Sequence, residues 1–414
     1  GVYSHISGVD VVRAPNARPE QVARRACGVQ QALRRAAGQA VPDCLGIRLL
    51  TDAALRSRRW APDDGVAPHA ARRALAQWQA QHGAQTPPAQ LRTTLWAPLQ
   101  RQAQALLQRQ LRELQAQRVE DGAVLVLDNA SGEVLAWVGS SGALSQAREV
   151  DAVLAPRQPG STLKPLLYAQ AIAQRRLSAA SLIEDAPTHI PTAAGLYIPQ
   201  NYDRRFRGWV SVRTALASSL NIPAVRTLAM VSPDAFARQL AALALPLRES
   251  GDHYGLGLAL GSAEVNLLNL SNAYRSLANQ GRHTPVAALA GAAASAAALQ
   301  ALDAGAAFIV GDILSDANAR ATTFGSDSLL ATRFWSAVKT GTSKDMRDNW
   351  AIGWSARYTV GVWVGNASGA PMGQVSGTAG AAPVWAGLMG WLHAREPSRA
   401  PAPPPGLVAQ AVRF

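Results

Sequence analysis

Residues 336–365 read SAVKTGTSKDMRDNWAIGWSARYTVGVWVG and contain three short apolar runs, at 336–342, 349–355 and 358–365. Runs of this length that are rich in Val, Trp and Thr are typical of β-strands. The short stretches between them, 345–347 and 356–357, suit turns. This segment therefore predicts three successive strands late in the chain.

A second strand pair is predicted much earlier in the chain. Residues 123–128 and 133–139 are apolar runs, and the intervening 129–132 reads NASG, which suits a hairpin turn. Both runs are apolar on both faces, so we expect the hairpin to be buried on both sides.

Helices are predicted on either side of these strands. Apolar residues recur at three-to-four spacing over 96–117 and over 382–393, and the stretch 161–282 is helical by pattern. The order is two strands, a helical block, three strands and a helix. It predicts an α/β fold of the α+β type, with an antiparallel five-stranded sheet flanked by helices and an all-helical subdomain between its two groups of strands.

Composition sets limits on the function. Of the 414 residues 48% are apolar and 16% charged, which excludes wholesale disorder, and the length predicts one large domain plus something smaller. No apolar run is long enough to span a membrane. Cys27 and Cys44 can form one bridge or none, and neither they nor the histidines show metal-ligand spacing. We expect no metal and no cofactor.

The positive charge is concentrated in the first third of the chain. The net charge is +13, and residues 1–120 contribute +9 of it, from 17 Arg against 8 acidic residues. The arginines are spread singly and in pairs, without the interleaved aromatic residues that single-strand binders use. We therefore expect a solvated basic segment and no nucleic-acid partner.

Lysine is rare, and its positions are informative. The chain has 37 Arg but only three Lys, at 164, 339 and 344. Arginine supplies positive charge but does not give up its proton, so a lysine kept in such a chain can mark chemistry that arginine cannot perform. Lys164 and Lys339 lie in recognisable motifs, whereas Lys344 is expected to be a solvated turn residue.

The first motif is S-x-x-K within Pro159-Gly160-Ser161-Thr162-Leu163-Lys164-Pro165. The Pro-Gly turn and the proline after the lysine predict that Ser161 lies at a helix N-terminus. Lys164 then lies one turn later on the same face, within hydrogen-bond reach of Ser161. A serine nucleophile needs an adjacent base, and lysine can serve if burial or a second cation lowers its pKa.

Two further motifs follow. Ser219-Leu220-Asn221 is S-x-N, and residues 339–342 read KTGT in a strand-like run. Gly341 leaves room for a ligand backbone against the strand, Lys339 supplies a cation, and Thr340 and Thr342 supply hydroxyls suited to a carboxylate. Alone, S-x-x-K and S-x-N are weak evidence and K-T-G-T is moderate, but the order S-x-x-K, S-x-N, K-T-G is the motif set of penicillin-recognising serine enzymes.

The chain resembles the transpeptidase domain of class A penicillin-binding proteins over residues 91–393. The resemblance extends beyond the three motifs to the following stretches: PQNYD at 199–203, RTALASSLN at 213–221, RDNW at 347–350 and GVWVG at 361–365. It implies a D,D-transpeptidase that acts on peptidoglycan stem peptides and is trapped by β-lactams.

The resemblance also implies residue roles. Ser161 attacks the carbonyl between two terminal D-alanines, and Lys164 takes its proton. Ser219 relays a proton to the leaving amine, and Asn221 holds the donor peptide. Lys339, Thr340 and Thr342, in the strand that includes Gly341, bind the terminal carboxylate. Backbone N–H groups of Ser161 and Thr342 form the oxyanion hole.

The expected organisation has three parts. Residues 1–90 are a basic helical remnant of a glycosyltransferase domain plus linker, without glycosyltransferase activity; 91–395 are the transpeptidase domain; and 396–414 are a Pro-rich linker toward a further domain. In the full-length family the location is periplasmic, at the inner membrane, so we expect membrane association only through an N-terminal anchor that this sequence lacks.

Other functions remain open on sequence alone. A serine β-lactamase needs a base for the deacylating water, and the nearest candidate, Glu264, lies at an ordinary helix start. A D,D-carboxypeptidase uses the same motifs with water as acceptor. A non-catalytic penicillin-binding sensor would keep the fold without turnover. The lifetime of a penicillin adduct on Ser161 separates these functions.

Overall fold

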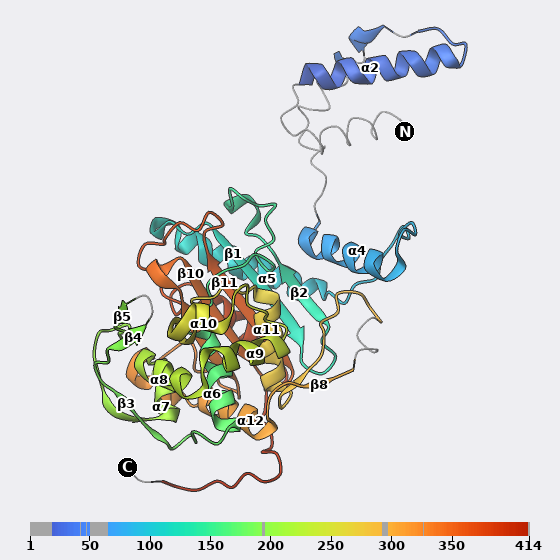
Figure 1. Cartoon of the computed structure of the whole chain (residues 1–414). Coiled ribbons are helices and arrows are strands. Elements are labelled where there is room, and N and C mark those ends of the chain that lie inside the picture. The colour runs from blue at the N-terminus through green and yellow to red at the C-terminus, as the bar shows by residue number, and fades with distance from the viewer. Residues whose placement is uncertain are drawn as a thin grey trace. The chain divides into compact units, whose positions relative to one another are not determined.

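The five predicted strands form one antiparallel sheet in a computed structural model of the chain (Figure 1). They are β1 (Asp121–Asp128), β2 (Val134–Val138), β9 (Ala337–Thr342), β10 (Asp348–Trp354) and β11 (Tyr358–Gly365), in the order β2-β1-β11-β10-β9. β1 pairs with β11 from Asp121 opposite Gly365 to Asp128 opposite Tyr358. The early hairpin and the late strands therefore form one sheet, as predicted, and they join where β1 pairs with β11.

The structure describes residues 19–41, 43–46, 48–49, 65–192, 195–291, 297–325 and 327–412. The chain divides into two compact units, Gly1–Gly65 and Val66–Phe414. The sheet and all three motifs belong to the second unit. The prediction for residues 1–90 falls partly on residues outside those described.

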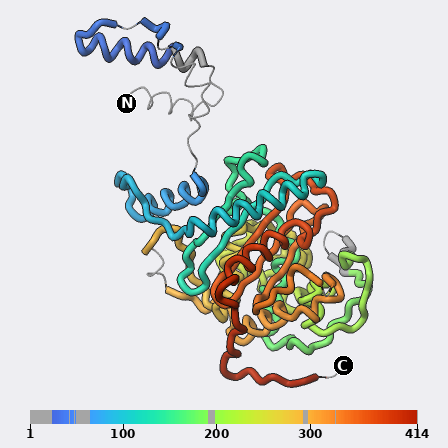
Figure 2. The backbone as a smooth tube through the Cα atoms, turned by 180° about the vertical axis from the view of Figure 1, so that it is seen from behind, coloured from blue at the N-terminus to red at the C-terminus, as the bar shows by residue number. Residues whose placement is uncertain are grey.

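Both faces of the sheet are covered, which explains why its strands are continuously apolar. Val124, Val126 and Val362 lie in one buried cluster, which also contains residues of α5 (Ala97–Glu113) and α14 (Ala382–Leu392). Leu125, Ile352 and Trp363 lie in a second cluster on the opposite face. Figure 2 shows α5 and α14 lying across the sheet on the side seen from behind. Neighbouring residues of one strand point to opposite faces, so each strand contributes to both clusters.

Helices from the middle of the chain cover the other face. The helices are α6 (Lys164–Ala173), α7 (Val212–Ala217), α8 (Asn221–Val231), α9 (Pro233–Ala242), α10 (Gly251–Tyr254), α11 (Leu267–Ala278), α12 (Ala304–Ser315) and α13 (Ala317–Phe324). Of these, α11 packs on β1, β10 and β11, and α12 packs on β9.

The middle block is not helical throughout, which corrects the all-helical reading of that part. β3 (Leu182–Asp185) pairs with β6 (Gly208–Ser211), and β4 (Ile190–Thr192) pairs with β5 (Gly195–Tyr197). Each of these strands has only three or four residues. A run that short shows too little alternation to be recognised beside long helical patterns.

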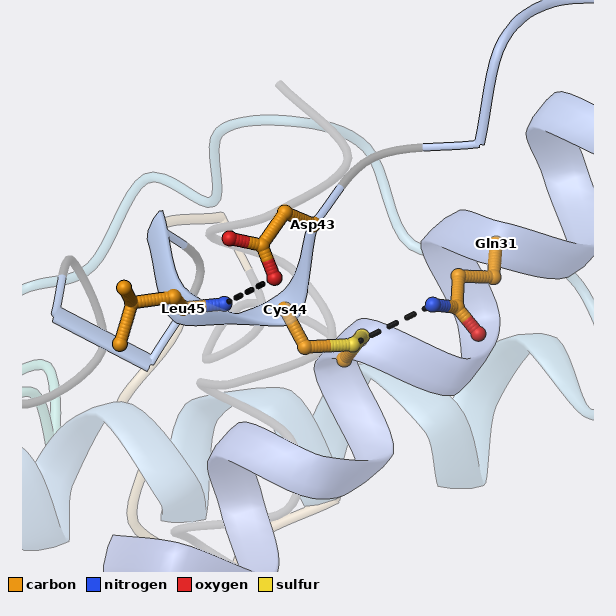
Figure 3. The surroundings of a disulfide bond; sticks show 5 residues. Gln31, Asp43, Cys44 and Leu45 are labelled. Carbon is orange, nitrogen blue, oxygen red and sulfur yellow. Dashed lines mark hydrogen bonds between the residues drawn. A yellow bond between two sulfur atoms is a disulfide. The ribbon is translucent and has the colours of Figure 1, made fainter.

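The first unit contains α2 (Pro19–Ala36) and a disulfide between Cys27 and Cys44. Figure 3 shows the bridge with the Nε2 atom of Gln31 donating to the Cys44 sulfur at 3.3 Å. Of the two states that the sequence allows, the structure has the bridged one. In the second unit α4 (Pro68–His82) precedes the sheet, and the Pro-rich residues 397–412 form no helix or strand. Among the helices of the described residues, none combines the length and apolarity that crossing a membrane requires.

Candidate active site

Ser161 lies on a 3-10 turn, Gly160–Leu163, that runs directly into α6 at Lys164. Pro165 stands in the first turn of α6, where its missing N–H leaves no intrahelical bond unmade. The serine therefore lies at the start of a continuous helical segment, as its motif predicts. Its side chain is partly exposed, whereas Lys164 is fully buried.

The serine turn is pressed against strand β9. Gly160 has a φ of +55°, and a Cβ atom there would lie 2.5 Å from the carbonyl oxygen of Thr342. A Cβ atom at Gly341 would lie 2.4 Å from the carbonyl oxygen of Pro159. Two glycines thus bring the S-x-x-K turn into backbone contact with the K-T-G strand. The sequence suggested that the missing side chain of Gly341 leaves room for a ligand backbone. In the structure the S-x-x-K turn occupies that room.

Lys164 is held by the S-x-N segment. Its Nζ atom donates to the carbonyl oxygens of Ser219 and Leu220 at 2.8 and 3.1 Å, and to Oδ1 of Asn221 at 2.7 Å. Among the described residues the Ser161 hydroxyl makes no hydrogen bond, so the expected Ser161–Lys164 bond is not formed in this state. Complete burial and, second, the positive charge of Lys339 hold the pKa of Lys164 well below its usual range, against an opposing effect of Asp185.

Lys339 contacts the same segment from strand β9. Its Nζ atom donates to Oγ of Ser219 at 2.7 Å and to the carbonyl oxygen of Thr340 at 2.8 Å. Only 2% of the residue is exposed. Burial, together with the nearby positive charge of Arg320, lowers the pKa of Lys339 to about 7. The two lysines of the motifs therefore converge on three consecutive residues.

Ser219 occupies a strained backbone position between the two lysines. Its φ of 61° is left-handed, which costs a non-glycine residue about 1–3 kcal/mol and persists only where the surroundings enforce it. The carbonyl oxygen of Ser219 accepts from Lys164 while its hydroxyl accepts from Lys339. In this conformation one residue contacts both lysines.

Asn221 is fixed by a buried network that sequence reasoning missed. Its backbone N–H donates to Oδ1 of Asn201 at 2.8 Å, and its Nδ2 donates to the carbonyl oxygen of Gln200 at 2.7 Å. The Nδ2 atom of Asn201 donates to both carboxylate oxygens of Asp185 at 2.8 Å, and the Arg207 N–H donates to the same carboxylate at 3.0 Å. The only sequence signal was that Asn201 lies in the PQNYD stretch of the resemblance, to which no role was attached.

The two threonines of K-T-G-T lie in β9, the strand that also carries Lys339. Thr340 is buried, and Thr342 is partly exposed with its Oγ1 accepting from the Gly377 N–H at 3.0 Å. Arg320, also missed from sequence, is buried and donates to the carbonyl oxygens of Leu314 and Leu330. Burial lowers the pKa of Arg320 to about 10. The region is therefore rich in buried basic groups, of which Lys339 and Arg320 can supply positive charge to an anionic ligand.

The geometry gathers the three motifs into one site. The Ser161 turn contacts β9, and the lysines of S-x-x-K and K-T-G both bond the S-x-N segment. A buried lysine of lowered pKa near a serine is suited to nucleophilic catalysis, and a second cation on a strand is suited to holding a carboxylate. The described residues contain no group of three or more His, Cys, Asp or Glu that could hold a metal ion.

Comparison with known families agrees with this geometry. Residues 122–379 match the family model described as penicillin binding protein transpeptidase domain. The chain belongs to the penicillin-binding protein transpeptidase family. The match covers the sheet from β1 to β11 and all three motifs, and it confirms the resemblance to class A penicillin-binding proteins.

Curated relatives carry the same domain within longer chains. The chain is 34% identical over 323 residues to penicillin-binding protein 1C of Escherichia coli, covering 77% of this chain and 40% of that protein. It is 31% identical over 286 residues to penicillin-binding protein 1A of Neisseria meningitidis, covering 65% of this chain and 35% of that protein. The chain thus spans less than half the length of these relatives.

Solved structures share the fold. Penicillin-binding protein 1A of Haemophilus influenzae superposes with a TM-score of 0.71 at 16% identity, covering 93% of this chain and 78% of that one. PonA1 of Mycobacterium tuberculosis superposes with a TM-score of 0.69 at 20% identity, covering 83% of this chain and 99% of that one. The predicted fold class, an antiparallel five-stranded sheet flanked by helices, is confirmed.

Proposed function

We propose that this chain is a D,D-transpeptidase that cross-links peptidoglycan stem peptides through an acyl-enzyme on Ser161, and that β-lactams acylate the same serine. One observation carries the proposal: Lys164 and Lys339, both buried, each hydrogen-bond the S-x-N segment at 2.7 Å. Family membership supports transpeptidase chemistry in general. Burial of two lysine amines without a hydrogen bond to a carboxylate is costly, and lowered lysine pKa values of this origin are typical of an active site.

In the first step Ser161 Oγ bonds to the carbonyl carbon between the two terminal D-alanines. A neutral Lys164 accepts the serine proton. A neutral amine keeps two N–H groups, which suffice for Asn221 Oδ1 and the Ser219 carbonyl oxygen. The longer third bond, to the Leu220 carbonyl oxygen, is given up so that the lone pair can accept the serine proton. Catalytic hydrogen bonds often tighten only when substrate is bound, so the missing Ser161–Lys164 bond does not oppose this role.

The remaining site residues bind and stabilise. Lys339 with Thr340 and Thr342 holds the terminal carboxylate, and Gly341 lets that strand lie against the serine turn. The N–H groups of Ser161 and Thr342 stabilise the oxyanion, where one donor typically contributes about 3–4 kcal/mol to the transition state. Asn221 holds the donor peptide backbone.

The acyl-enzyme forms as the C–N bond breaks and Ser219 relays a proton to the departing D-alanine nitrogen. In the second step the amine of a neighbouring stem peptide attacks the ester carbonyl. The C–Oγ bond then breaks, and the proton from the amine returns to Ser161. One amide is lost and one is formed, so no cofactor is consumed.

We propose a periplasmic location and the three-part organisation given by the sequence, with the transpeptidase domain at 91–395. The Cys27–Cys44 bridge supports an oxidising compartment. Membrane association would depend on an N-terminal anchor of the full-length family, and we expect no glycosyltransferase activity from residues 1–90. Residues 396–414 would serve as the linker.

Intact mass after addition of a fluorescent penicillin tests the proposal. We expect a stable one-to-one adduct that maps to Ser161 and is abolished in Ser161→Ala, with the thermal melt nearly unchanged. The matched control is Ser178→Ala, which removes an exposed serine hydroxyl and should label like wild type. Labelling of Ser161→Ala at the wild-type rate would refute the nucleophile. An adduct that vanishes within seconds would indicate a β-lactamase instead. Equal release of D-alanine with and without an amine acceptor would indicate a carboxypeptidase.

A further inference from the structure

Large aromatic side chains are exposed beside the site along residues 202–209, a loop that continues into the first two residues of β6. Tyr202, Phe206 and Trp209 are 68%, 41% and 66% exposed. They are three of the four strongly exposed aromatic residues in the described part of the chain, the fourth being Trp96. We call residues 202–209 the aromatic loop. Exposed aromatic side chains this close together in sequence indicate a binding surface, because aromatic side chains otherwise bury most of their area.

The aromatic loop is held in one shape by hydrogen bonds. The Arg204 N–H donates to the carbonyl oxygen of Asn201 at 3.0 Å, and the Asn201 Nδ2 donates to the carbonyl oxygen of Arg205 at 2.8 Å. The Arg207 side chain pairs with Asp203 at 2.8 Å. A loop closed in this way loses little conformational entropy when a ligand binds.

The same bonds connect the aromatic loop to the active site. Asn201, which immediately precedes Tyr202, accepts from the Asn221 N–H, and Asn221 accepts from Lys164. The exposed rings therefore begin one residue away from the framework that positions the catalytic lysine. A long ligand lying on the loop would have its nearest part at the S-x-N side of the site.

The aromatic loop also carries unpaired positive charge. Arg204 and Arg205 are exposed, and within the described residues neither forms an ion pair, while the one carboxylate of the loop, Asp203, is taken by Arg207. Guanidinium groups bind carboxylates through paired hydrogen bonds. The surface thus combines flat apolar rings with two cationic groups free for an anion.

We infer that the aromatic loop binds the polymeric substrate, namely a glycan strand whose stem peptides carry carboxylates. This inference rests on the proposed function. Sugar rings present flat faces of C–H groups that stack on aromatic rings, and stem-peptide carboxylates match Arg204 and Arg205. A protein partner would also accept aromatic and arginine side chains. The link from Asn201 to Asn221 favours the polymer, because only a substrate strand must continue into the active site.

Two variants test the inference, each with a matched control. Tyr202→Ser with Trp209→Ser removes two exposed rings, and the control Leu299→Ser with Val408→Ser removes two exposed apolar side chains elsewhere. Arg204→Gln with Arg205→Gln removes two exposed charges, and the control Arg101→Gln with Arg112→Gln removes two from α5. Binding is measured by co-sedimentation with purified peptidoglycan, intact or stripped of its peptides, and acylation by penicillin is measured on the same samples.

We expect the ring variant to bind both preparations at least about tenfold more weakly than wild type, as for a central aromatic contact. The charge variant should bind the stripped glycan like wild type, and should bind intact peptidoglycan more weakly than wild type, no better than it binds the stripped glycan. Both variants and both controls should acylate with penicillin at the wild-type rate. If both variants sediment as strongly as the wild-type chain, the inference is overturned. It is also overturned if the wild-type chain is acylated by penicillin but does not sediment with peptidoglycan, and a protein would then be the remaining candidate partner. Absence of acylation in the wild type would overturn the proposed function and leave the binding comparison valid.

Discussion

The Nζ atom of Lys339 lies 2.7 Å from Oγ of Ser219, across 120 residues of sequence. This bond ties strand β9 to the loop before α8. The hydroxyl of Ser219 accepts from the lysine, so its own proton is free to be donated elsewhere. The Ser219 carbonyl at the same time accepts from Lys164. One residue therefore lies between the lysine proposed as base and the lysine proposed to hold the carboxylate.

The first prediction concerns the pH dependence of acylation. The pKa of Lys339 is lowered to about 7, so Lys339 is protonated below that pH and becomes neutral above it. Acylation by a carboxylate-bearing β-lactam should therefore fall as the pH rises through about 7. Rates of adduct formation measured from pH 5 to 10 check this. In Lys339→Arg the guanidinium stays protonated, so the falling limb should move to higher pH even if the maximum rate is lower. A wild-type rate that is flat from pH 6 to 9 would contradict the prediction.

The second prediction concerns the base. Lys164→Arg keeps the positive charge but replaces a group that can be neutral by one that stays protonated. We expect acylation to fall by about 10²–10⁴-fold, the usual contribution of a general base. The rate constant of adduct formation measures this. Lys344→Arg is the matched control, because Lys344 is exposed in the turn after β9, and it should acylate normally. Robust acylation by Lys164→Arg would remove Lys164 from the mechanism.

The third prediction separates steric contact from backbone strain. Gly160 and Gly255 share a φ of +55°, but a Cβ at Gly160 would meet the Thr342 backbone at 2.5 Å, while one at Gly255 would meet nothing within 4 Å. Gly255, whose ψ is −148°, lies in another sparsely populated positive-φ region, so Gly255→Ala should cost about 1–3 kcal/mol from backbone strain without a steric contact. Gly160→Ala should destabilise more and also slow acylation, because the serine turn must move away from β9. Denaturant unfolding and adduct formation measure both effects. Equal losses in the two variants would show that the close contact is unimportant.

Much of the fold was predictable from local pattern, because the five strands are buried on both faces and read as continuous apolar runs. The serine and both lysines were found because their motifs are short and local. The Asp185–Asn201–Asn221 network was not predictable, since Asp185 and Asn201 are 16 positions apart, Asn201 and Asn221 are 20 apart, and nothing local marks a polar residue as buried. A ligand-binding role was predicted for Gly341 for a similar reason. Gly341 actually packs against Pro159, which lies on the other side of the whole helical block in sequence. Long-range contacts of this kind leave no periodic signal.

The last prediction concerns Asp185, a buried residue that we propose as a positioning residue. Its carboxylate accepts from Asn201 and from the Arg207 N–H, and its negative charge raises the pKa of Lys164 against the effects of burial and Lys339. Asp185→Asn removes that charge, so the pKa of Lys164 should fall further. If Lys164 must be neutral to accept the serine proton, the acid limb of the acylation profile should move to lower pH.

Asp185→Asn should also destabilise the fold by about 1.5–3 kcal/mol, because hydrogen bonds to a charged acceptor are lost. Asn279→Leu is the control for stability alone. Asn279 donates to the carbonyl oxygen of Asn129, and neither residue belongs to the three motifs or to the Asp185 network. It should lower the melting temperature and leave the pH profile in place. Acylation rates from pH 4 to 8 and thermal melts on the same samples distinguish the two. If Asp185→Asn lowers stability but leaves the acid limb where it is in wild type, Asp185 supports the fold without tuning the lysine.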